Sequence, residues 1–259
     1  MRTIDDPNDP NDPNGPNGPN DVMGLRSAIS TPFGKRRYVR RLFDTIADRY
    51  DLITVLLSYG LDRRWKDRLI ELAAITSDDR VLDVACGTGD ILGRARRKAR
   101  VAVGLDVTFR MLLHAAGKSE PSPRLVAGDM QELPFPPSSF TVVTAGYGLR
   151  NVPHIEQAID EIARVLAPRG RLASLDFNRP RQPVLRALYL AYLTIVGSVL
   201  GFVLHRDPDT YRYIPESIRN YPGAEGVAKL LADRGFTDVR VVPLLGGLMA
   251  IHLATRAGR

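Results

Sequence analysis

A glycine-rich turn flanked by acidic residues is the stretch of this chain best suited to bind a ligand. Residues 80–90, RVLDVACGTGD, run from an apolar strand into a turn that holds Gly87 and Gly89 and then into a helix. Glycine tolerates backbone conformations that side chains obstruct, and a helix that begins at the carboxyl end of a strand offers free backbone N–H groups. Asp83 precedes the glycines and suits a cationic or amine-bearing ligand better than a pyrophosphate, so the turn differs from the dinucleotide fingerprint G-x-G-x-x-G.

Two further acids follow predicted strands of the same sheet. Asp106 ends the second strand, 17 residues after Gly89, where an acid that binds ribose hydroxyls is expected. Asp129 follows the third strand, where its carboxylate can accept a hydrogen bond from an adenine amino group. Either acid alone could cap a strand end, but together they favour an adenosine-containing ligand. The turn at 83–89 resembles motif I of class I S-adenosylmethionine-dependent methyltransferases, which favours that cofactor over NAD.

The elements that position these residues alternate along the chain, which predicts right-handed crossovers and a parallel, doubly wound α/β sheet. Apolar spacing predicts two N-terminal helices before the sheet. Two segments near the C-terminus are expected to close the sheet as an antiparallel hairpin. The expected strands are 80–84, 101–106, 124–127, 140–145 and 171–177, the hairpin is 236–244 and 248–255, and the helices are 38–57, 62–74, 90–98, 108–116 and 154–166.

Length and composition indicate the number of domains, the redox compartment and the character of the N-terminal tail. The 259 residues suit one large α/β domain, and the single cysteine, Cys86, excludes an internal disulfide and suits a reducing compartment. Residues 5–20 repeat Pro, Asn, Asp and Gly without an apolar residue, so we expect a disordered tail over 1–35 and a single domain over 36–259. The tail lacks the apolar core of a secretory signal.

Charge and hydropathy are both unevenly distributed. Residues 1–21 hold five aspartates against one arginine, so their charge of −4 leaves +11 for the rest of a chain whose formal net charge is +7. Residues 187–204 contain no charged side chain over 18 positions. A membrane span is disfavoured because the closing hairpin would then lie on the other side of the bilayer from its sheet. A helix that covers the active site or lies on a membrane surface is preferred, and core packing is the alternative.

Three stretches beyond the glycine turn resemble the demethylmenaquinone and ubiquinone-precursor C-methyltransferase family, over roughly residues 38–255. They are Tyr50 to Lys66, Gly148 to Pro180 with its GLRN run, and Tyr211 to Arg219. The resemblance implies a Rossmann-like class I methyltransferase fold, mostly parallel, with N-terminal helices and an apolar helical insertion after the fifth strand. It also implies methyl transfer from S-adenosyl-L-methionine to a ring carbon of a polyprenyl quinol.

The predicted site residues come partly from the residue types in the glycine turn and partly from this resemblance. The resemblance assigns cofactor contacts to Thr88, Asp106, Asp129 and Met130, while a serine of the family pattern is replaced by Gly146. The glycine turn adds its own three residues, which gives the cofactor set Asp83, Gly87, Thr88, Gly89, Asp106, Asp129, Met130 and Gly146.

A quinol reacts best as its phenolate, so the site needs a proton acceptor or a cation beside the ring oxygen. Arg150 stays protonated and is therefore assigned to stabilising the phenolate or orienting a water. The catalytic set is Arg150, Asn151, Tyr147 and Tyr50. No His/Cys cluster has the spacing of a metal site.

The resemblance also implies a place in the cell and partners. An enzyme that modifies a prenylated ring must approach the membrane, so we expect a cytoplasmic protein at the inner face of the membrane, with the apolar segment and the basic residues 35–41 and 179–186 in contact with lipid. The sequence is compatible with a homo-oligomer. No nucleic-acid partner is expected, because aromatic residues do not interleave with the arginines. The alternatives are a methyltransferase of another lipid or small molecule and a non-catalytic scaffold that binds the cofactor.

Overall fold

One mixed sheet organises the computed structural model, which describes residues 22–58, 60–118 and 120–258. Within these residues seven strands lie in the order β3-β2-β1-β4-β5-β7-β6. The strands β1 to β5 are parallel, and β7 is antiparallel to β5 and β6. The doubly wound sheet and its closing hairpin are thus confirmed. The bounds are β1 Arg80–Val84, β2 Val101–Asp106, β3 Arg124–Ala127, β4 Phe140–Gly146, β5 Leu166–Phe177, β6 Phe236–Leu244 and β7 Met249–Arg256.

Strand β5 begins five residues earlier than its apolar run predicts. Leu166 pairs with Phe140, and pairing resumes only at Arg171 opposite Val142. The intervening residues form an irregularity in which Arg169 has a φ of 61°. Residues 167–170, which separate the predicted helix from the predicted strand, are therefore an irregularity inside β5.

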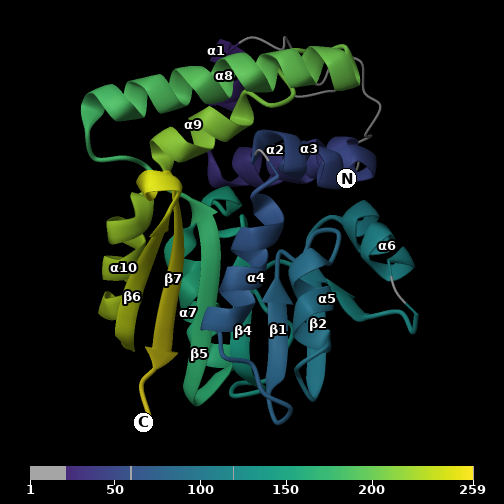
Figure 1. The fold of residues 1–259 in the computed structure, drawn as a ribbon, viewed down its shortest axis with the longest axis vertical. Helices are drawn as coiled ribbons and strands as arrows, with labels where there is room; N and C mark the ends of the chain where they lie inside the picture. Colours follow the sequence, from purple (N-terminus) through teal and green to yellow (C-terminus); the bar gives the residue numbers. More distant parts are fainter. Residues whose placement is uncertain (1–21, 59, 119, 259) are drawn as a thin grey trace, which may run out of the picture.

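Helices cover both faces of the sheet (Figure 1). Along β1, Val81 packs in the cluster that includes residues of α4 and α5, whereas Leu82 and Val84 pack in the cluster that includes residues of α7 and α10. This alternation follows from the two-residue period of a strand that is buried on both sides. The bounds are α4 Asp62–Leu72, α5 Asp90–Arg96, α6 Phe109–Gly117, α7 Ile155–Val165 and α10 Gly223–Asp233.

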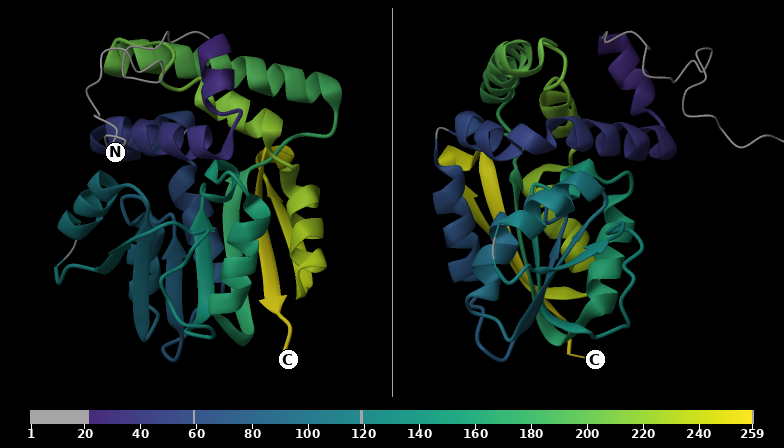
Figure 2. Two further views of the ribbon diagram at one scale, coloured as in Figure 1. Left: turned by 180° about the vertical axis from the view of Figure 1, so that it is seen from behind. Right: turned by 90° about the vertical axis from the view of Figure 1, so that its right-hand side faces the viewer.

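The remaining helices form a cap across the carboxyl ends of the parallel strands (Figures 1 and 2). Val39, Leu42 and Ile53 from the N-terminal helices share one apolar cluster with Tyr211 and Tyr213. In open α/β sheets this end of the sheet is where ligands bind, so the cap encloses the predicted site. The cap consists of α1 Val22–Ala28, α2 Pro32–Ile46, α3 Tyr50–Leu57, α8 Pro183–His205 and α9 Tyr213–Asn220.

The N-terminal region differs from the expectation in two ways. The predicted single helix 38–57 is divided into α2 and α3 by a 3₁₀ turn at Ala47–Arg49. Asp48 in that turn binds Arg110 and His114 of α6, a tertiary contact that apolar spacing does not reveal. The predicted tail boundary at residue 35 is also wrong, because α1 and the first turn of α2 occupy residues within 22–35. The rest of the predicted tail, residues 1–21, lies outside the described residues.

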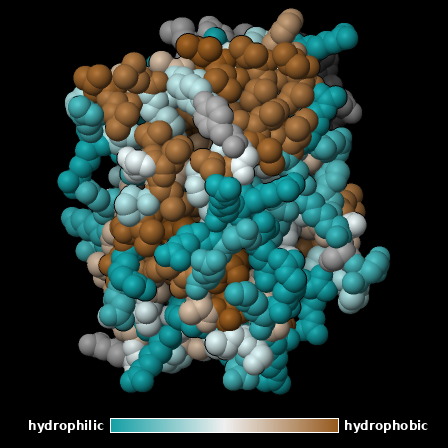
Figure 3. Space-filling view, viewed as in Figure 1, coloured by the Kyte–Doolittle hydropathy of each residue, from teal (hydrophilic) through white to brown (hydrophobic). Residues whose placement is uncertain are grey.

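The apolar segment 187–204 forms part of α8, a 23-residue helix whose length and composition would suffice to cross a membrane. In its most apolar window, of mean hydropathy 2.1, only 28% is buried, so packing in the core does not explain this composition. Its outer side chains add to the apolar surface at the top of the molecule (Figure 3). Because β5 precedes α8 and pairs with β7 after it, both ends of the helix connect to the same sheet.

Candidate active site

The turn between β1 and α5 brings backbone rather than side chains to the site. Ala85, Gly87 and Gly89 have φ values of 51°, 53° and 81°. A methyl group added at Gly87 would meet only the Tyr50 ring, at 3.8 Å. At Gly89 it would come within 3.1 Å of the Ala115 Cβ atom. Gly87 therefore leaves its backbone open to a ligand, whereas Gly89 allows α5 to pack closely against α6.

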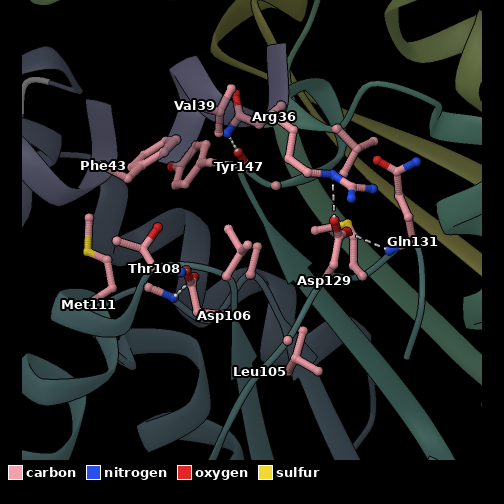
Figure 4. Close-up of a pocket in the computed structure, with 18 of the residues that line it drawn as sticks. Arg36, Val39, Phe43, Leu105, Asp106, Thr108, Met111, Asp129, Gln131 and Tyr147 are labelled. Carbon is pink, nitrogen blue, oxygen red and sulfur yellow. Dashed lines mark hydrogen bonds and ion pairs between the residues drawn. The ribbon is translucent and has the colours of Figure 1, made fainter. Parts of the chain in front are cut away.

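A cavity opens beside this turn at the carboxyl ends of β1, β2 and β4 (Figure 4). Asp106 lies in it and joins two loops, because its carboxylate accepts hydrogen bonds from the Gly87 N–H at 2.9 Å and the Thr108 N–H at 2.8 Å. Burial raises the pKa of Asp106, an effect that these two backbone donors oppose. Met130 and Gly146 also line the cavity. A Cβ atom at Gly146 would lie 2.3 Å from Cδ1 of Ile91, so a side chain there would require the end of the Ile91 side chain to move.

Asp129 stands at the opposite wall of this cavity, where helix α2 reaches it. Its Oδ1 accepts a hydrogen bond from the Gln131 N–H at 2.9 Å, and its Oδ2 pairs with Nε of Arg36 at 3.1 Å (Figure 4). The neighbouring Lys35 donates to the carbonyl oxygens of Arg150 and Val152 at 3.1 and 2.6 Å. Burial lowers the pKa of Lys35 to about 8. The predicted assignment of residues 35–41 to a membrane face is therefore wrong for these two cations, which bind the rim of the site.

Three residues of the predicted cofactor set do not line the cavity. Asp83 is fully buried within the sheet, its Oδ1 accepts a hydrogen bond from the Thr144 hydroxyl at 2.7 Å, and burial raises its pKa to about 7. The Thr88 hydroxyl donates to Asp51 at 2.6 Å and accepts from Lys118 at 2.9 Å. Gly89 faces a separate polar groove beside Lys118. These three residues therefore lie outside the lining of this cavity, and their assignment to the cofactor stays a prediction.

The donor set of the cavity fits S-adenosylmethionine. Its two carboxylates stand on opposite sides, as a ligand with ribose hydroxyls and an adenine amine requires. Two buried oxygens on its wall, Oε1 of Gln131 and Oδ1 of Asn151, have no hydrogen-bond partner among the described residues. Buried polar atoms are normally satisfied, so a polar ligand is expected to engage them. Val39, Phe43 and Met111 supply apolar walls.

A second cavity lies under α8 and α9, where the sequence predicts an apolar helix that covers the active site. The volume within it that the centre of a water molecule can reach is about 390 Å³, against about 80 Å³ in the first cavity. Among the described residues that line it, Arg150 alone is charged. The spacing of the tyrosines in α8 and α9 was the sequence signal from which the lining of this cavity could have been predicted. The apolar and aromatic lining includes Leu42, Ile53, Trp65, Phe177, Tyr189, Tyr192, Leu193, Tyr211, Tyr213 and Leu248.

The two cavities share a wall. Phe43, Tyr50 and Tyr147 line both of them. Tyr147 adopts a φ of 58°, which is uncommon for a residue other than glycine, and such backbone strain tends to gather at functional sites. Burial raises the pKa of Tyr50 to about 12, so its phenol is neutral at physiological pH.

The other predicted catalytic residues lie on either side of this wall. Nη1 of Arg150 donates to Asp176 and to the Tyr147 carbonyl oxygen, both at 3.0 Å. Its guanidinium carbon lies 4.7 Å from the centre of the Phe177 ring, and its Nε has no partner among the described residues. Asn151 lines the first cavity and donates to the same carbonyl oxygen at 2.8 Å. The structure thus brings all four predicted catalytic residues to the junction of the cavities.

Gly148 provides a test of how tightly this junction is packed. A Cβ atom at Gly148 would come within 2.7 Å of the Ala85 Cβ atom and 3.0 Å of Cε of Met130. We expect Gly148→Ala to lower the free energy of unfolding by about 1–3 kcal/mol, because overpacking forces the backbone apart. Urea unfolding measures this. Gly93→Ala is the control, since an added methyl there meets no atom within 4 Å in helix α5. Equal stability of the two variants would show that the junction is loosely packed.

Comparisons with known proteins agree with one another. The model of the ubiE/COQ5 methyltransferase family matches residues 32–256. A ubiquinone/menaquinone biosynthesis C-methyltransferase from Ectopseudomonas mendocina is 38% identical over 232 residues, which cover 84% of this chain and 88% of that protein. A demethylmenaquinone methyltransferase from Thermus thermophilus is 39% identical over 220 residues, which cover 83% of this chain and 100% of that protein.

Solved structures resemble the fold at lower identity. A methyltransferase from Thermotoga maritima that depends on S-adenosylmethionine aligns with a TM-score of 0.60 and 15% identity, over 84% of this chain and 99% of that one. A methyltransferase of the same dependence from Aquifex aeolicus aligns with a TM-score of 0.53 and 16% identity, over 73% of this chain and 88% of that one. At such identities the likeness supports the class I methyltransferase fold alone.

Proposed function

The chain belongs to the ubiE/COQ5 methyltransferase family, and from this premise we propose how its two cavities carry out the S-adenosylmethionine-dependent C-methylation of a quinol in quinone biosynthesis. The cofactor supplies a methyl group on a positively charged sulfur, which is already a good electrophile. The protein must therefore hold the acceptor carbon in line with that methyl group and raise the electron density of the ring. The two tasks fall to two different cavities.

The first cavity is assigned to the cofactor. Asp129 is placed to accept a hydrogen bond from the adenine amine, and Asp106 to accept hydrogen bonds from the ribose hydroxyls. The open backbone at Gly87 and the walls formed by Met130 and Gly146 complete the cofactor site. Asp83, Thr88 and Gly89 precede or belong to the same turn, but they do not line this cavity.

The second cavity is assigned to the quinol ring. Its apolar and aromatic lining suits a planar ring with an isoprenoid tail. Arg150 places a positive charge in these surroundings, with Nε unpartnered and Nη1 held by Asp176. A phenolate oxygen next to that charge is stabilised far more than in water, because the local dielectric constant is low. Tyr50 then orients the acceptor at the shared wall, and Asn151 holds the Tyr147 carbonyl oxygen from the side of the cofactor cavity.

The shared wall of Phe43, Tyr50 and Tyr147 is the observation that carries this assignment, because the methyl group has to pass there. The test incubates the purified protein with S-adenosylmethionine and either reduced demethylmenaquinone or the corresponding benzoquinol. We expect one equivalent of S-adenosylhomocysteine for each quinol that gains a methyl group. Cofactor binding without transfer to either ring would support the scaffold alternative, and transfer only to another lipid would overturn the choice of acceptor.

We further propose that the outer face of α8 rests on the membrane surface. This face carries Leu188, Ile195 and Phe202, whose exposed fractions are 64%, 65% and 63%. A contiguous apolar face of this kind marks an interaction surface. Lipid is the favoured occupant because the quinol cavity lies directly beneath this helix and its acceptor partitions into the bilayer. Arg181, just before the helix, and Arg186, in its first turn, can attract anionic headgroups.

Replacing Ile195 by Glu tests this membrane contact. We expect Ile195→Glu to abolish flotation with anionic liposomes at low salt, because a charge in the middle of the apolar face opposes its insertion between headgroups. Turnover of a soluble, short-chain quinol should persist. Val241→Glu, on the exposed side of β6, is the control and should float like the wild type. Unchanged flotation of Ile195→Glu, or a wild type that buries this face in a homodimer in solution, would contradict the proposal.

A further inference from the structure

Tyr147 connects the junction of the cavities to a buried carboxylate that no part of the proposed site uses. Its phenol donates a hydrogen bond of 2.7 Å to Oδ1 of Asp62. Asp62 is the first residue of α4 and is only 1% exposed. The Tyr147 backbone is held in place, because its N–H donates to the Leu175 carbonyl oxygen at 2.7 Å while Arg150 and Asn151 bind its carbonyl oxygen. The Tyr147 phenol is therefore held in a fixed position between Asp62 and the two cavities.

From Asp62 a row of ionisable groups leads to the surface. Oδ2 of Asp62 pairs with Nζ of Lys66 at 2.7 Å, and Lys66 pairs with Asp90 at 3.0 Å. Asp90 pairs with Lys118 at 2.9 Å, and Lys118 reaches Asp51 at 2.5 Å. The Lys66 side chain is 5% exposed, whereas those of Lys118 and Asp51 are 35% and 49% exposed. The row thus begins at the reaction site and ends in solvent.

The other carboxylates near the junction are committed elsewhere. Asp176 accepts hydrogen bonds from the Arg150 guanidinium and the Phe177 N–H. Asp106 accepts from two backbone N–H groups, and Asp129 pairs with Arg36. Asp62 is the carboxylate in this neighbourhood, within the described chain, whose hydrogen bond ends on a side chain that lines both cavities.

We infer that Asp62 is the proton acceptor of the methyl transfer and that it acts through Tyr147. The inference rests on the proposed function. The quinol O–H bond breaks as its proton moves to the Tyr147 oxygen, and the Tyr147 proton moves to Oδ1 of Asp62. The electron pair left on the quinol oxygen raises the density at the ring carbon. After methylation the proton on this carbon moves to the ring oxygen, and the proton held by Asp62 leaves along the row to Lys118, so that one proton is released overall.

The charges around this pair come from several elements. Lys66 of α4 and Asp90 of α5 lie on the Asp62 side, Tyr50 of α3 and Asp176 of β5 lie on the Tyr147 side, and both tyrosines are buried. Burial and Asp62 raise the pKa of Tyr147 well above its ordinary value. Tyr147 is therefore protonated throughout the physiological range, and it can only pass on one proton while it takes up another.

Asp62→Asn and Tyr147→Phe test the relay through the pH dependence of kcat with a short-chain demethylmenaquinol. We expect each variant to lose about 10²–10⁴-fold in kcat near neutral pH, the usual contribution of a positioned base. The loss should shrink about tenfold per pH unit towards pH 10, near the ordinary pKa of a phenol, because an ionised quinol needs no acceptor. Asp62→Glu should restore part of the rate.

The matched control is Asp67→Asn, on the same helix, whose carboxylate is 59% exposed and pairs with Arg94 away from both cavities. It should retain the wild-type profile. Affinity for S-adenosylhomocysteine, measured by calorimetry, should be unchanged in the Asp62 and Asp67 variants, whose side chains do not line the cofactor cavity. If Asp62→Asn does not fold, the neutral pair Asp62→Asn with Lys66→Met replaces it.

The outcomes separate the relay from the function on which it rests. A loss that is equal at every pH, or normal turnover by Asp62→Asn, would overturn the relay while leaving the proposed function intact. A wild-type protein that methylates neither quinol would overturn the proposed function and the relay with it.

Discussion

Arg150→Met is expected to lower kcat for quinol methylation by about 10²–10³-fold, the usual cost of removing a group that stabilises developing negative charge. The cavity that Arg150 faces has no other charged side chain among the described residues, so no neighbour can take over its role. Affinity for S-adenosylhomocysteine should change little, because Arg150 does not line the cofactor cavity. Steady-state turnover and calorimetric titration measure the two effects separately.

Removing Arg150 also leaves the buried Asp176 without its cation, which can cost about 3–5 kcal/mol of stability. The double variant Arg150→Met with Asp176→Asn removes this charge and should be equally inactive. Arg171→Met is the control, since Arg171 pairs with Asp79 at 2.6 Å away from both cavities. Wild-type kcat in a folded Arg150→Met protein would show that the charge does not act on the ring.

Asp106→Ala is expected to weaken the binding of S-adenosylhomocysteine by at least about 10–100-fold, as the loss of one or two hydrogen bonds to a charged group predicts. Two effects combine. The variant loses the acceptor assigned to the ribose hydroxyls, and it also frees the Gly87 and Thr108 N–H groups that hold the turn beside β2. Calorimetry of the purified protein measures the change in affinity.

The matched variant for this effect is Asp233→Asn, at the exposed end of α10. It should bind the cofactor product like the wild type. Urea unfolding of Asp106→Ala then separates loss of the turn from loss of the direct contact, since a loosened turn also lowers stability. Full affinity of the Asp106→Ala variant would show that Asp106 does not contribute to the cofactor site.

The sheet could be predicted from the sequence because its strands are buried on both faces. Within residues 80–84, Val81, Leu82 and Val84 are apolar, and the helices between strands follow a clear period. Prediction from local sequence patterns failed where contacts between residues far apart in the chain determine the structure. The break between α2 and α3 depends on Asp48 binding α6, and the inward turn of Lys35 and Arg36 depends on acceptors more than 90 residues away.

The candidate site was predicted in part for a similar reason. The chain position of a carboxylate indicates which end of a strand it occupies, so Asp106 and Asp129 were placed at the cavity. It does not indicate which partners a side chain meets, so the hydrogen bonds of Asp83 with Thr144 and of Thr88 with Asp51 could not be predicted. The full lining of the apolar cavity could not be predicted, because α2, α3, α8 and α9 each supply only part of its wall.

The most direct test of this account is a crystal structure of the protein with S-adenosylhomocysteine bound. We predict the adenine beside Asp129, the ribose at Asp106 and the sulfur facing the shared wall at Tyr147, with Arg150 across that wall in the apolar cavity. Binding in the polar groove beside Gly89 and Lys118, or a sulfur turned away from Tyr147, would contradict the assignment of the cofactor to the first cavity and of the quinol to the second.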